Sequence, residues 1–302
     1  MRATLLYNPN AGRANHRQSI DAVAKALRSR DVEVFTEPTN GPGTAGQQVR
    51  EIDTDLLFAC GGDGTVHEAV QGLAHHPSAT LGVIPLGSAN ALARHLKLSL
   101  DPVEAALQQL SFVSTKISLG HVSFASDAGR SERYFLSLVG AGPDGMLVRE
   151  LRSTAKQQSG RSAYYVRAAR LFATTRFSPF NVTADGVTQQ AVSAMAIRIS
   201  DLGGLFSPLT PAADLHHPQL QLTLTQSPAE LSLPAWFGLS WVRLHALNPF
   251  TRTLFVDSFQ CGEGTRAPVS VQADGEWLGH TPMSVTLVPD ALRILLPNAD
   301  AR

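Results

Sequence analysis

Three short loops rich in glycine and small polar residues have the composition of phosphate-binding turns. They are Asn8–Gly12, Gly61–Thr65 and Pro85–Asn90. Glycine lets the backbone approach a phosphate closely, and the first N–H groups of a following helix attract anions. Asp63 adds a carboxylate to the second loop, which suits chemistry that handles phosphate together with a metal ion or a proton. One such turn alone is usually only a turn, but three in equivalent positions favour a phosphate site.

The elements that must position these loops alternate between strand and helix patterns over residues 1 to about 120. Strand-like runs occur at Ala3–Tyr7, Val32–Phe35, Asp55–Cys60 and Leu81–Ile84. Helical spacing is found at Ile20, Val23, Ala24 and Leu27, and over Val66–Ala74, Ala89–Leu96 and Pro102–Leu110, the last capped by Asp101. Alternation of this kind predicts a parallel sheet with helices on its faces, and the three loops then share the carboxyl edge where ligands bind.

Beyond residue 130 strand patterns dominate. They occur at Tyr134–Val139, Val192–Ser200, Leu220–Thr225, Leu254–Cys261, Val269–Ala273, Met283–Val288 and Leu292–Leu296. Asp185–Gly186 predicts a hairpin, and the alternation in Leu220–Thr225 predicts a half-buried strand. Two helical insertions are expected near 160–176 and 230–247. We therefore expect a mainly antiparallel second domain, joined to the first by a linker at Ser123–Arg133.

The composition excludes several classes of protein. The 302 residues include 25 Lys+Arg and 25 Asp+Glu, with 43% hydrophobic and 17% charged residues. A chain this apolar does not stay mostly disordered, and it lacks the excess positive charge typical of nucleic-acid-binding proteins. Two cysteines, Cys60 and Cys261, argue against a disulfide framework or a structural zinc site. Because neither a secretory signal nor an apolar stretch of about 20 residues occurs, we expect a cytoplasmic protein.

Standard nucleotide-binding motifs do not account for the three loops. No Gly-x-x-x-x-Gly-Lys-[Ser/Thr] sequence occurs. Gly140–Gly145 matches Gly-x-Gly-x-x-Gly, but Pro143 is expected to disrupt the helix start, and no first βαβ unit surrounds the motif. We therefore interpret this match as a false dinucleotide-binding motif.

The ordered loops resemble the signature of the diacylglycerol kinase catalytic-domain family. The blocks that carry the resemblance are Asn8–Gly12, Gly61–Glu68 and Pro85–Ala93, and Phe135–Gly142, Ala163–Tyr165 and Asp274–Glu276 follow in the order found in the family. The family includes bacterial diacylglycerol kinases, YegS-like lipid kinases, sphingosine kinases and ceramide kinases. The resemblance covers nearly the whole chain, and the first two blocks are its most specific part.

The resemblance implies two domains with the active site in a cleft between them. Residues 1–128 would form an α/β nucleotide-binding domain with a parallel sheet, as in NAD kinases and diacylglycerol kinases. Residues 129–289 would form a mainly antiparallel β-sandwich that binds the lipid. A last strand near 290–302 would pack back on the first domain.

The resemblance also implies the site residues of an ATP-dependent lipid kinase that uses Mg²⁺. The residues implied in ATP binding are Asn8, Pro9, Asn10, Ala11, Gly12, Thr36, Gly61, Gly62, Asp63, Gly64, Thr65, Val66, His67, Glu68, Gly87, Ser88 and Asn90. A carboxylate would accept the proton of the lipid hydroxyl while the γ-phosphoryl group is transferred. Bacterial relatives imply Glu276 for this role, with Asp274 in the same segment, whereas sphingosine kinases imply Asp63.

Two departures from the family pattern affect the expected site. Ala91 stands where many bacterial members carry an aspartate, so the third loop is closer to the sphingosine-kinase form. The segment Pro211–Pro218 lacks the Asp-Gly that holds a structural Mg²⁺ in bacterial diacylglycerol kinases, and His217 replaces the aspartate on the metal side. Asp63, Asp214 and His217 remain as candidate metal ligands, although Mg²⁺ prefers oxygen.

The lipid side of the reaction is predicted from charge. Residues 149–176 contain seven basic residues and one acidic residue, and 161–172 fits a basic amphipathic helix. Such a helix can contact an anionic membrane surface, here the inner face of the membrane, or it can be an ordinary surface helix with its apolar stripe in the core. The lipid substrate lies at a membrane, and no nucleic-acid partner is expected.

Two other functions are compatible with some of these features. An NAD kinase-like small-molecule kinase shares the Gly-Gly-Asp-Gly loop, but the Asn-Glu pair of those enzymes does not occur here. A non-catalytic lipid- or nucleotide-binding relative would explain Ala91 and the altered metal region. The presence of Asp63, Glu276 and all three glycine loops favours the kinase.

Overall fold

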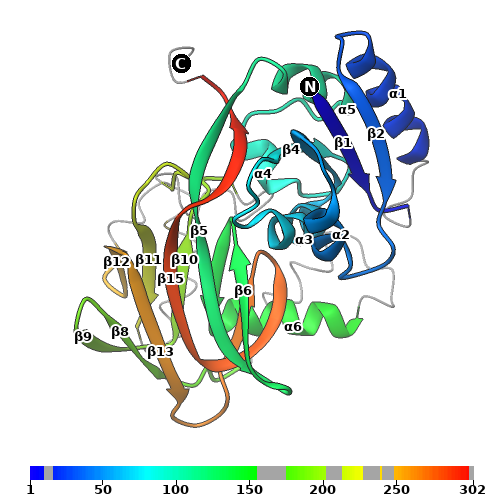
Figure 1. Cartoon of the computed structure of the whole chain (residues 1–302). Coiled ribbons are helices and arrows are strands. Elements are labelled where there is room, and N and C mark those ends of the chain that lie inside the picture. Colours follow the sequence, from blue (N-terminus) through cyan, green and yellow to red (C-terminus); the bar gives the residue numbers. More distant parts are fainter. Residues whose placement is uncertain (10–15, 155–174, 202–212, 227–238, 240–247, 299–302) are drawn as a thin grey trace. The chain divides into compact units, whose positions relative to one another are not determined.

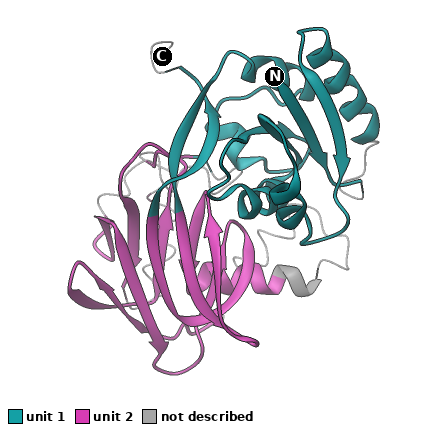
Figure 2. Cartoon of the chain, viewed as in Figure 1, with its two compact units in different colours: residues 1–119, 201–206, 288–302 teal, residues 120–200, 207–287 magenta. Residues whose placement is uncertain are grey.

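The computed structural model describes residues 1–9, 16–154, 175–201, 213–226, 239 and 248–298 (Figure 1). The chain divides into two compact units (Figure 2). Unit 1 comprises residues 1–119, 201–206 and 288–302, and unit 2 comprises residues 120–200 and 207–287. Strands β5 (Val113–Ser126) and β15 (Glu276–Leu296) each carry residues of both units. The boundaries drawn from the sequence, at 128 and 289, stay a prediction.

Unit 1 contains a parallel sheet in the strand order β4-β3-β1-β2. Its strands are β1 (Arg2–Tyr7), β2 (Glu33–Pro38), β3 (Leu56–Gly61) and β4 (Thr80–Pro85). Its helices are α1 (His16–Arg28), α2 (Ala45–Glu51), α3 (Asp63–Leu73), α4 (Ala91–His95) and α5 (Pro102–Gln109). Within this unit, Ile294 of β15 pairs in parallel with Leu81 of β4.

Local sequence signals explain most of unit 1. The apolar residues of α1 that are spaced for one helix face are the ones that are buried, namely Ile20, Val23, Ala24 and Leu27. Every residue of β3 and β4 is buried, as expected for parallel strands covered on both faces. Asp101 caps α5 by accepting hydrogen bonds from Val103 N and Glu104 N, and Pro102 stands in the first turn. Helix α2 was not predicted.

Unit 2 is a β-sandwich built mainly from antiparallel strand pairs. One run of paired strands is β12-β11-β10-β7-β14-β15, while β13 pairs with β15 and β8, β8 with β9, and β5 with β6. In addition to parts of β5 and β15, unit 2 contains β6 (Gly129–Phe135), β7 (Leu138–Ala141), α6 (Pro143–Thr154), β8 (Phe180–Ala184), β9 (Val187–Ala191), β10 (Ser193–Ile197), β11 (Leu220–Thr225), β12 (Thr251–Val256), β13 (Ser258–Gly264) and β14 (Ser270–Ala273).

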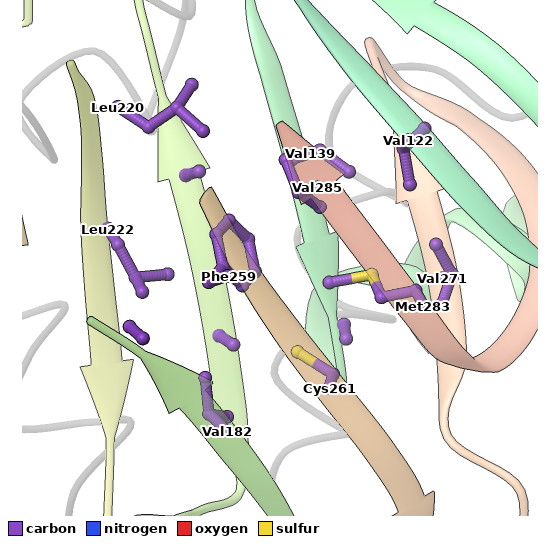
Figure 3. Close-up of a cluster of buried hydrophobic side chains, with 14 of the residues drawn as sticks. Val122, Val139, Val182, Leu220, Leu222, Phe259, Cys261, Val271, Met283 and Val285 are labelled. Atoms are coloured by element: carbon purple, nitrogen blue, oxygen red, sulfur yellow. The ribbon is translucent and has the colours of Figure 1, made fainter. Parts of the chain in front are cut away.

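The core of unit 2 is formed by apolar side chains from many of these strands (Figure 3). Residues from strands far apart in the sequence meet there, such as Val139, Leu222 and Met283. The close-up labels Val122, Val139, Val182, Leu220, Leu222, Phe259, Cys261, Val271, Met283 and Val285. The predicted hairpin at Asp185–Gly186 is confirmed, because both residues have positive φ angles, 48° and 74°, between β8 and β9.

Several predictions for unit 2 are wrong in detail. The expected linker Ser123–Arg133 is instead part of the β5–β6 hairpin, in which polar side chains occupy the exposed face. The run Leu254–Cys261 divides between β12 and β13, whereas Met283–Val288 and Leu292–Leu296 belong to the single strand β15. The threonines of β11 are buried together with its leucines, so the strand is covered on both faces.

The interpretation of Pro143 is also wrong. Pro143 begins α6 directly after β7, in the first helical position, where its missing N–H costs no hydrogen bond. The helical insertions expected near 160–176 and 230–247 lie largely outside the described residues. None of the helices within the described ranges is long and apolar enough to cross a membrane.

Candidate active site

The loop after β3 turns directly into helix α3. Gly62 is the N-cap of the helix, and its carbonyl oxygen accepts hydrogen bonds from Thr65 N at 3.0 Å and Val66 N at 3.2 Å. A Cβ atom at Gly61 would overlap the side chain of Thr65, so only glycine fits there. Gly64 is exposed and has open space around it. The loop therefore presents the amino end of α3 on the surface of unit 1.

The loop after β4 packs backbone against backbone with the β3 loop. A Cβ atom at Gly87 would overlap Gly62 Cα, and Leu86 N donates to Gly61 O at 3.0 Å. The Asn90 side chain holds Gly87 at both backbone groups: its Oδ1 accepts from Gly87 N at 2.9 Å, and its Nδ2 donates to Gly87 O at 2.8 Å. Two of the three predicted phosphate loops thus form one continuous surface.

Asp63 joins these two loops. Its Oδ2 accepts a hydrogen bond from Asn90 N at 3.0 Å, and its Oδ1 accepts one from Ala91 N at 2.7 Å. Both carboxylate oxygens therefore satisfy N–H groups at the start of α4. At position 91, where the sequence departs from many bacterial relatives, the backbone N–H rather than the side chain makes this contact. Asp63 has a clear architectural role.

Glu68 has a comparable role in α3. Its Oε1 accepts from Gly43 N at 2.9 Å and its Oε2 from Ala45 N at 3.2 Å, at the start of α2. The spacing of 23 to 25 residues between these groups offers no local sequence signal. Glu68, predicted to contact ATP, thus orients the helix that the sequence analysis missed.

The remaining residues predicted to bind ATP differ in exposure. Gly87 and Ser88 are exposed, as is Thr36 on β2. Val66 and His67 are buried within α3. Asn8 and Pro9 follow the carboxyl end of β1, while Asn10, Ala11 and Gly12 lie outside the described residues. Because β1, β3 and β4 are parallel, the segments that follow them lie at the same edge of the unit 1 sheet.

In unit 2, Asp274 and Gly275 form the tight turn between β14 and β15. Their φ angles are 48° and 81°, which fits the Asp-Gly preference of such hairpins. The Asp274 carboxylate accepts three backbone hydrogen bonds, from Leu136 N at 2.8 Å, Ser137 N at 2.8 Å and Leu138 N at 2.9 Å. Asp274 therefore ties the turn to the segment between β6 and β7.

Glu276, the third predicted catalytic carboxylate, contacts a basic side chain. One carboxylate oxygen lies 2.8 Å from an Arg133 guanidinium nitrogen. The Glu276 side chain is 36% exposed and the Arg133 side chain is 26% exposed. Glu276 is thus held by a basic side chain and is partly accessible to a substrate.

A buried arginine supports the Asp274 turn. Arg198 is 2% exposed, and one of its guanidinium nitrogens donates to Leu215 O at 3.2 Å. Burial lowers the pKa of Arg198 to about 10, and the negative charges of Asp274 and Asp214 oppose this shift. Arg198 was not among the residues predicted from the sequence, although a lone arginine inside the apolar run Val192–Ser200 is a signal of a buried ion pair.

The expected metal ligands outside the glycine loop have other contacts. Asp214 Oδ1 accepts from His216 N at 3.1 Å. His217 accepts a hydrogen bond from Gln219 N at its Nδ1, and its ring stacks on Phe255 with the centroids 4.6 Å apart. Within the described ranges, no group of three or more His, Cys, Asp or Glu side chains could hold a metal ion. Asp214 and His217 do not fit the oxygen-rich octahedral site that Mg²⁺ needs.

Family comparison agrees with this arrangement of loops and strands. The family model described as the diacylglycerol kinase catalytic domain matches residues 2–122. The model described as the YegS C-terminal NAD kinase beta sandwich-like domain matches residues 137–296. The chain therefore belongs to the diacylglycerol kinase family of lipid kinases, and the resemblance found in the sequence is confirmed.

Individual relatives are similar over nearly the full length. The diacylglycerol kinase of Bacillus subtilis (strain 168) is 28% identical over 310 residues, which cover 99% of this chain and 98% of the relative. The diacylglycerol kinase of Staphylococcus carnosus (strain TM300) is 25% identical over 301 residues, which cover 98% and 95% of the two chains. The similarity thus extends over nearly the whole length of both relatives.

Solved structures share the fold. A putative diacylglycerol kinase from Bacillus anthracis str. Sterne has a TM-score of 0.79 at 22% identity and covers 99% of this chain, with 96% of its own chain covered. An NAD kinase from Archaeoglobus fulgidus in complex with ATP has a TM-score of 0.51 at 14% identity, with 98% and 93% covered. The predicted combination of an α/β unit and a β-sandwich is confirmed.

Proposed function

We propose that this lipid kinase transfers the γ-phosphoryl group of ATP to the hydroxyl group of a diacylglycerol. The observation that carries the proposal is the paired glycine surface of unit 1, in which Gly62, Gly87 and Asp63 assemble two loops at a sheet edge. Backbone N–H groups at such an edge bind phosphate. The relatives named diacylglycerol kinase, which match almost the whole chain, support the choice of lipid.

We assign the general base to Glu276. It accepts the proton of the lipid hydroxyl during phosphoryl transfer, and the contact with Arg133 keeps its carboxylate in place. Asp63 and Asp274 act instead through the backbone amides that they bind, by fixing the loops around the reacting groups. The Glu276 assignment is supported by its accessibility and by its side-chain contact.

Mg²⁺ enters this proposal as the partner of the ATP phosphates, where it neutralises charge. Mg²⁺ usually keeps several waters and takes only one or two carboxylates from a protein, so a dedicated cage is not required. Asp63 would be one such ligand, because its carboxylate supplies the oxygen atoms that Mg²⁺ prefers and lies in the glycine loop of unit 1. No step assigned to Glu276 depends on that contact.

Membrane contact through residues 149–176 stays a prediction. Most of this segment lies outside the described residues. Arg149, at its start, lies over the ring of Trp277, 5.5 Å from the centroid. The first cation of the basic segment therefore contacts Trp277, the residue that follows Glu276 in the chain. This contact supports a connection between the basic segment and the proposed base.

The test is phosphorylation by radiolabelled ATP of vesicles containing diacylglycerol, sphingosine, ceramide or phosphatidylglycerol, with soluble NAD as a further acceptor. We expect labelled diacylglycerol, and we expect Glu276→Gln to lower kcat by about 10²- to 10⁴-fold. Glu263→Gln is the matched control, because it removes an exposed carboxylate elsewhere in unit 2.

Three outcomes would contradict the proposal at different levels. If NAD alone is labelled, the phosphoryl acceptor is a dinucleotide and not a lipid. No label in any acceptor would favour a non-catalytic relative. Full activity of Glu276→Gln, with Asp63→Asn inactive yet folded, would transfer the role of base to Asp63.

A further inference from the structure

The Gly140–Gly145 motif brings the start of α6 against two strands. A Cβ atom at Gly140 would overlap the carboxylate of Asp144, and one at Gly145 would overlap Ser270 O of β14. Gly142 has a φ angle of 119°, and its N–H donates to Ser270 O at 3.0 Å. The three glycines thus permit a close contact between α6, β7 and β14. In this structure the motif serves packing of the helix and positions Asp144.

Asp144 is half-buried as a residue, but its Oδ1 atom is inaccessible to solvent, and its carboxylate faces a buried glutamine. Its Oδ2 accepts a hydrogen bond from Gln272 Nε2 at 2.9 Å. Burial raises the pKa of Asp144 to about 6, and the hydrogen bonds from Gln272 and from the backbone of Asp144 and Gly145 oppose this shift. Burial of a carboxyl group without a cationic partner is costly, so a position of this kind calls for an explanation.

Gln272 connects Asp144 to the turn that precedes Glu276. Gln272 is 2% exposed, and while its Nε2 donates to Asp144, its Oε1 accepts from Gly275 N at 3.1 Å. Both ends of one amide group are therefore used, and the amide cannot rotate without breaking both bonds. Gly275 is the residue immediately before Glu276.

We propose that Asp144 and Gln272 are positioning residues that set the orientation of Glu276 through the backbone of Gly275. The proposal rests on the function proposed above, in which Glu276 is the base. Asp274 fixes the same turn from the other side through Leu136, Ser137 and Leu138. Gln272 fixes the peptide unit between Asp274 and Gly275, one residue before the Cα atom that carries the Glu276 side chain.

The physical reason is the sensitivity of proton transfer to distance. A general base must lie within hydrogen-bond reach of the proton that it accepts, and a displacement of about 1 Å can reduce the rate by about 10²-fold. If Gln272 is lost, Gly275 N loses its acceptor and the turn can relax. The position of Glu276 then changes, while the nucleotide loops of unit 1 keep their own contacts.

The first test compares Gln272→Leu with Thr223→Ala, a variant of another buried polar side chain in the same sandwich. We expect Gln272→Leu to lower kcat by about 10- to 100-fold, with KM for ATP within about 2-fold of wild type. Thr223→Ala controls for loss of stability, and it should keep kcat. Asp144→Leu removes the acceptor of Gln272 Nε2, so its kcat should fall in the same direction as that of Gln272→Leu.

A second variant gives a readout that a merely structural role would not change. Gln272→Glu places two carboxyl groups at hydrogen-bond distance, and they must share one proton to keep both contacts. Cys261 also lies near Asp144, but burial raises the pKa of its thiol, so it stays neutral. We therefore expect Gln272→Glu to be active near pH 6 and to lose activity, relative to wild type, as the pH rises to 8.

Hydrogen exchange separates this inference from the proposed function. The Gly275 amide should exchange about 10-fold faster in Gln272→Leu than in wild type, and this measurement needs no substrate. If wild type phosphorylates no lipid but exchange changes as expected, the proposed function fails and the contact stands. If wild type is active and Gln272→Leu keeps full kcat, or if its exchange is unchanged, the positioning role is overturned. A flat pH profile of Gln272→Glu relative to wild type overturns it as well.

Discussion

Asp63 in unit 1 and Asp274 in unit 2 have similar contacts but different neighbours. Both carboxylates accept backbone hydrogen bonds from distant segments, Asp63 from α4 and Asp274 from the segment between β6 and β7. Around Asp63 the neighbouring surface consists of glycine backbone. Beside Asp274 the next carboxylate along the chain is Glu276, which contacts Arg133. The comparison shows that an aspartate in a motif can be architectural, and in our proposal the reactive carboxylate is the neighbouring Glu276.

The two regions also differ in the charge that stabilises the aspartate. Asp274 lies near the buried guanidinium of Arg198, which carries a full positive charge. Asp63 accepts hydrogen bonds from N–H groups at the start of the short helix α4, which carry partial charges. We therefore expect loss of the carboxylate to cost more free energy of unfolding at Asp274 than at Asp63.

The largest expected effect on stability follows from Asp274→Ala. Three backbone N–H groups lose their acceptor, and Arg198 stays buried with less opposite charge. The free energy of unfolding should fall by about 3–5 kcal/mol. Urea unfolding measures it, with Asp185→Ala at the exposed β8–β9 turn as a control. A loss no larger than that of Asp63→Ala would remove the distinction between the two regions.

A pH effect of about 3 kcal/mol is expected from Asp144, because its pKa rises from 3.8 to about 6 on burial. The folded state holds this proton more tightly than the unfolded state, so the stabilising contribution is complete below pH 4. It is lost as the pH rises from about 4 to about 6. Asp144→Asn lacks this dependence, so its stability relative to wild type should increase over that range. Parallel unfolding curves of the two proteins from pH 4 to pH 7 would contradict the prediction.

A smaller effect is expected from Asp63→Ala. Asn90 N and Ala91 N lose their acceptor, but the Asp63 side that they face is only half-buried, so water can partly replace the carboxylate. We expect a loss of about 2 kcal/mol, together with a higher KM for ATP because the third loop loses its support. Unfolding curves and ATP titrations measure the two effects. An unchanged KM would show that the loops do not need this link.

The smallest effect is expected from Asp101→Ala. This aspartate caps its own helix through Val103 N and Glu104 N, and all three residues are local neighbours. The cost should be about 1 kcal/mol, the usual value for an N-cap, with no change in kcat. Calorimetry and the vesicle assay check both statements. A cost above that of Asp63→Ala would mean that long-range links between loops are no stronger than local caps.

The parts of the fold that were predictable depend on neighbouring residues. The spacing of the apolar residues in α1, the cap of α5 and the Asp185–Gly186 turn all act within a few positions. The hairpin at Ser123–Arg133 was missed because its polar composition resembles that of a linker. Register with a partner strand, which no local pattern contains, decides that such a segment is a strand.

The candidate site was predictable to the level of motifs. The glycine loops and the segment Asp274–Glu276 were identified, because their residue types are rare in combination and the family order is specific. The contacts that each residue of these motifs makes were not predictable from the sequence. Asp63 binds residues 27 and 28 positions away, and Asp274 binds residues 136 to 138 positions away. Sequence spacing cannot separate an architectural carboxylate from a reactive one.

By itself, the sequence determined the family, the alternation of strands and helices in unit 1, and the places of the glycine loops after its strands. These features follow from local backbone preferences and from side chains that act within one turn or strand. Only the tertiary structure decided that Arg198 is buried beside Asp274, that Pro143 begins a helix, and that Gln272 links Asp144 to Gly275. Burial and long-range hydrogen bonds arise when distant strands pair, and they then decide which polar groups must be satisfied inside the protein.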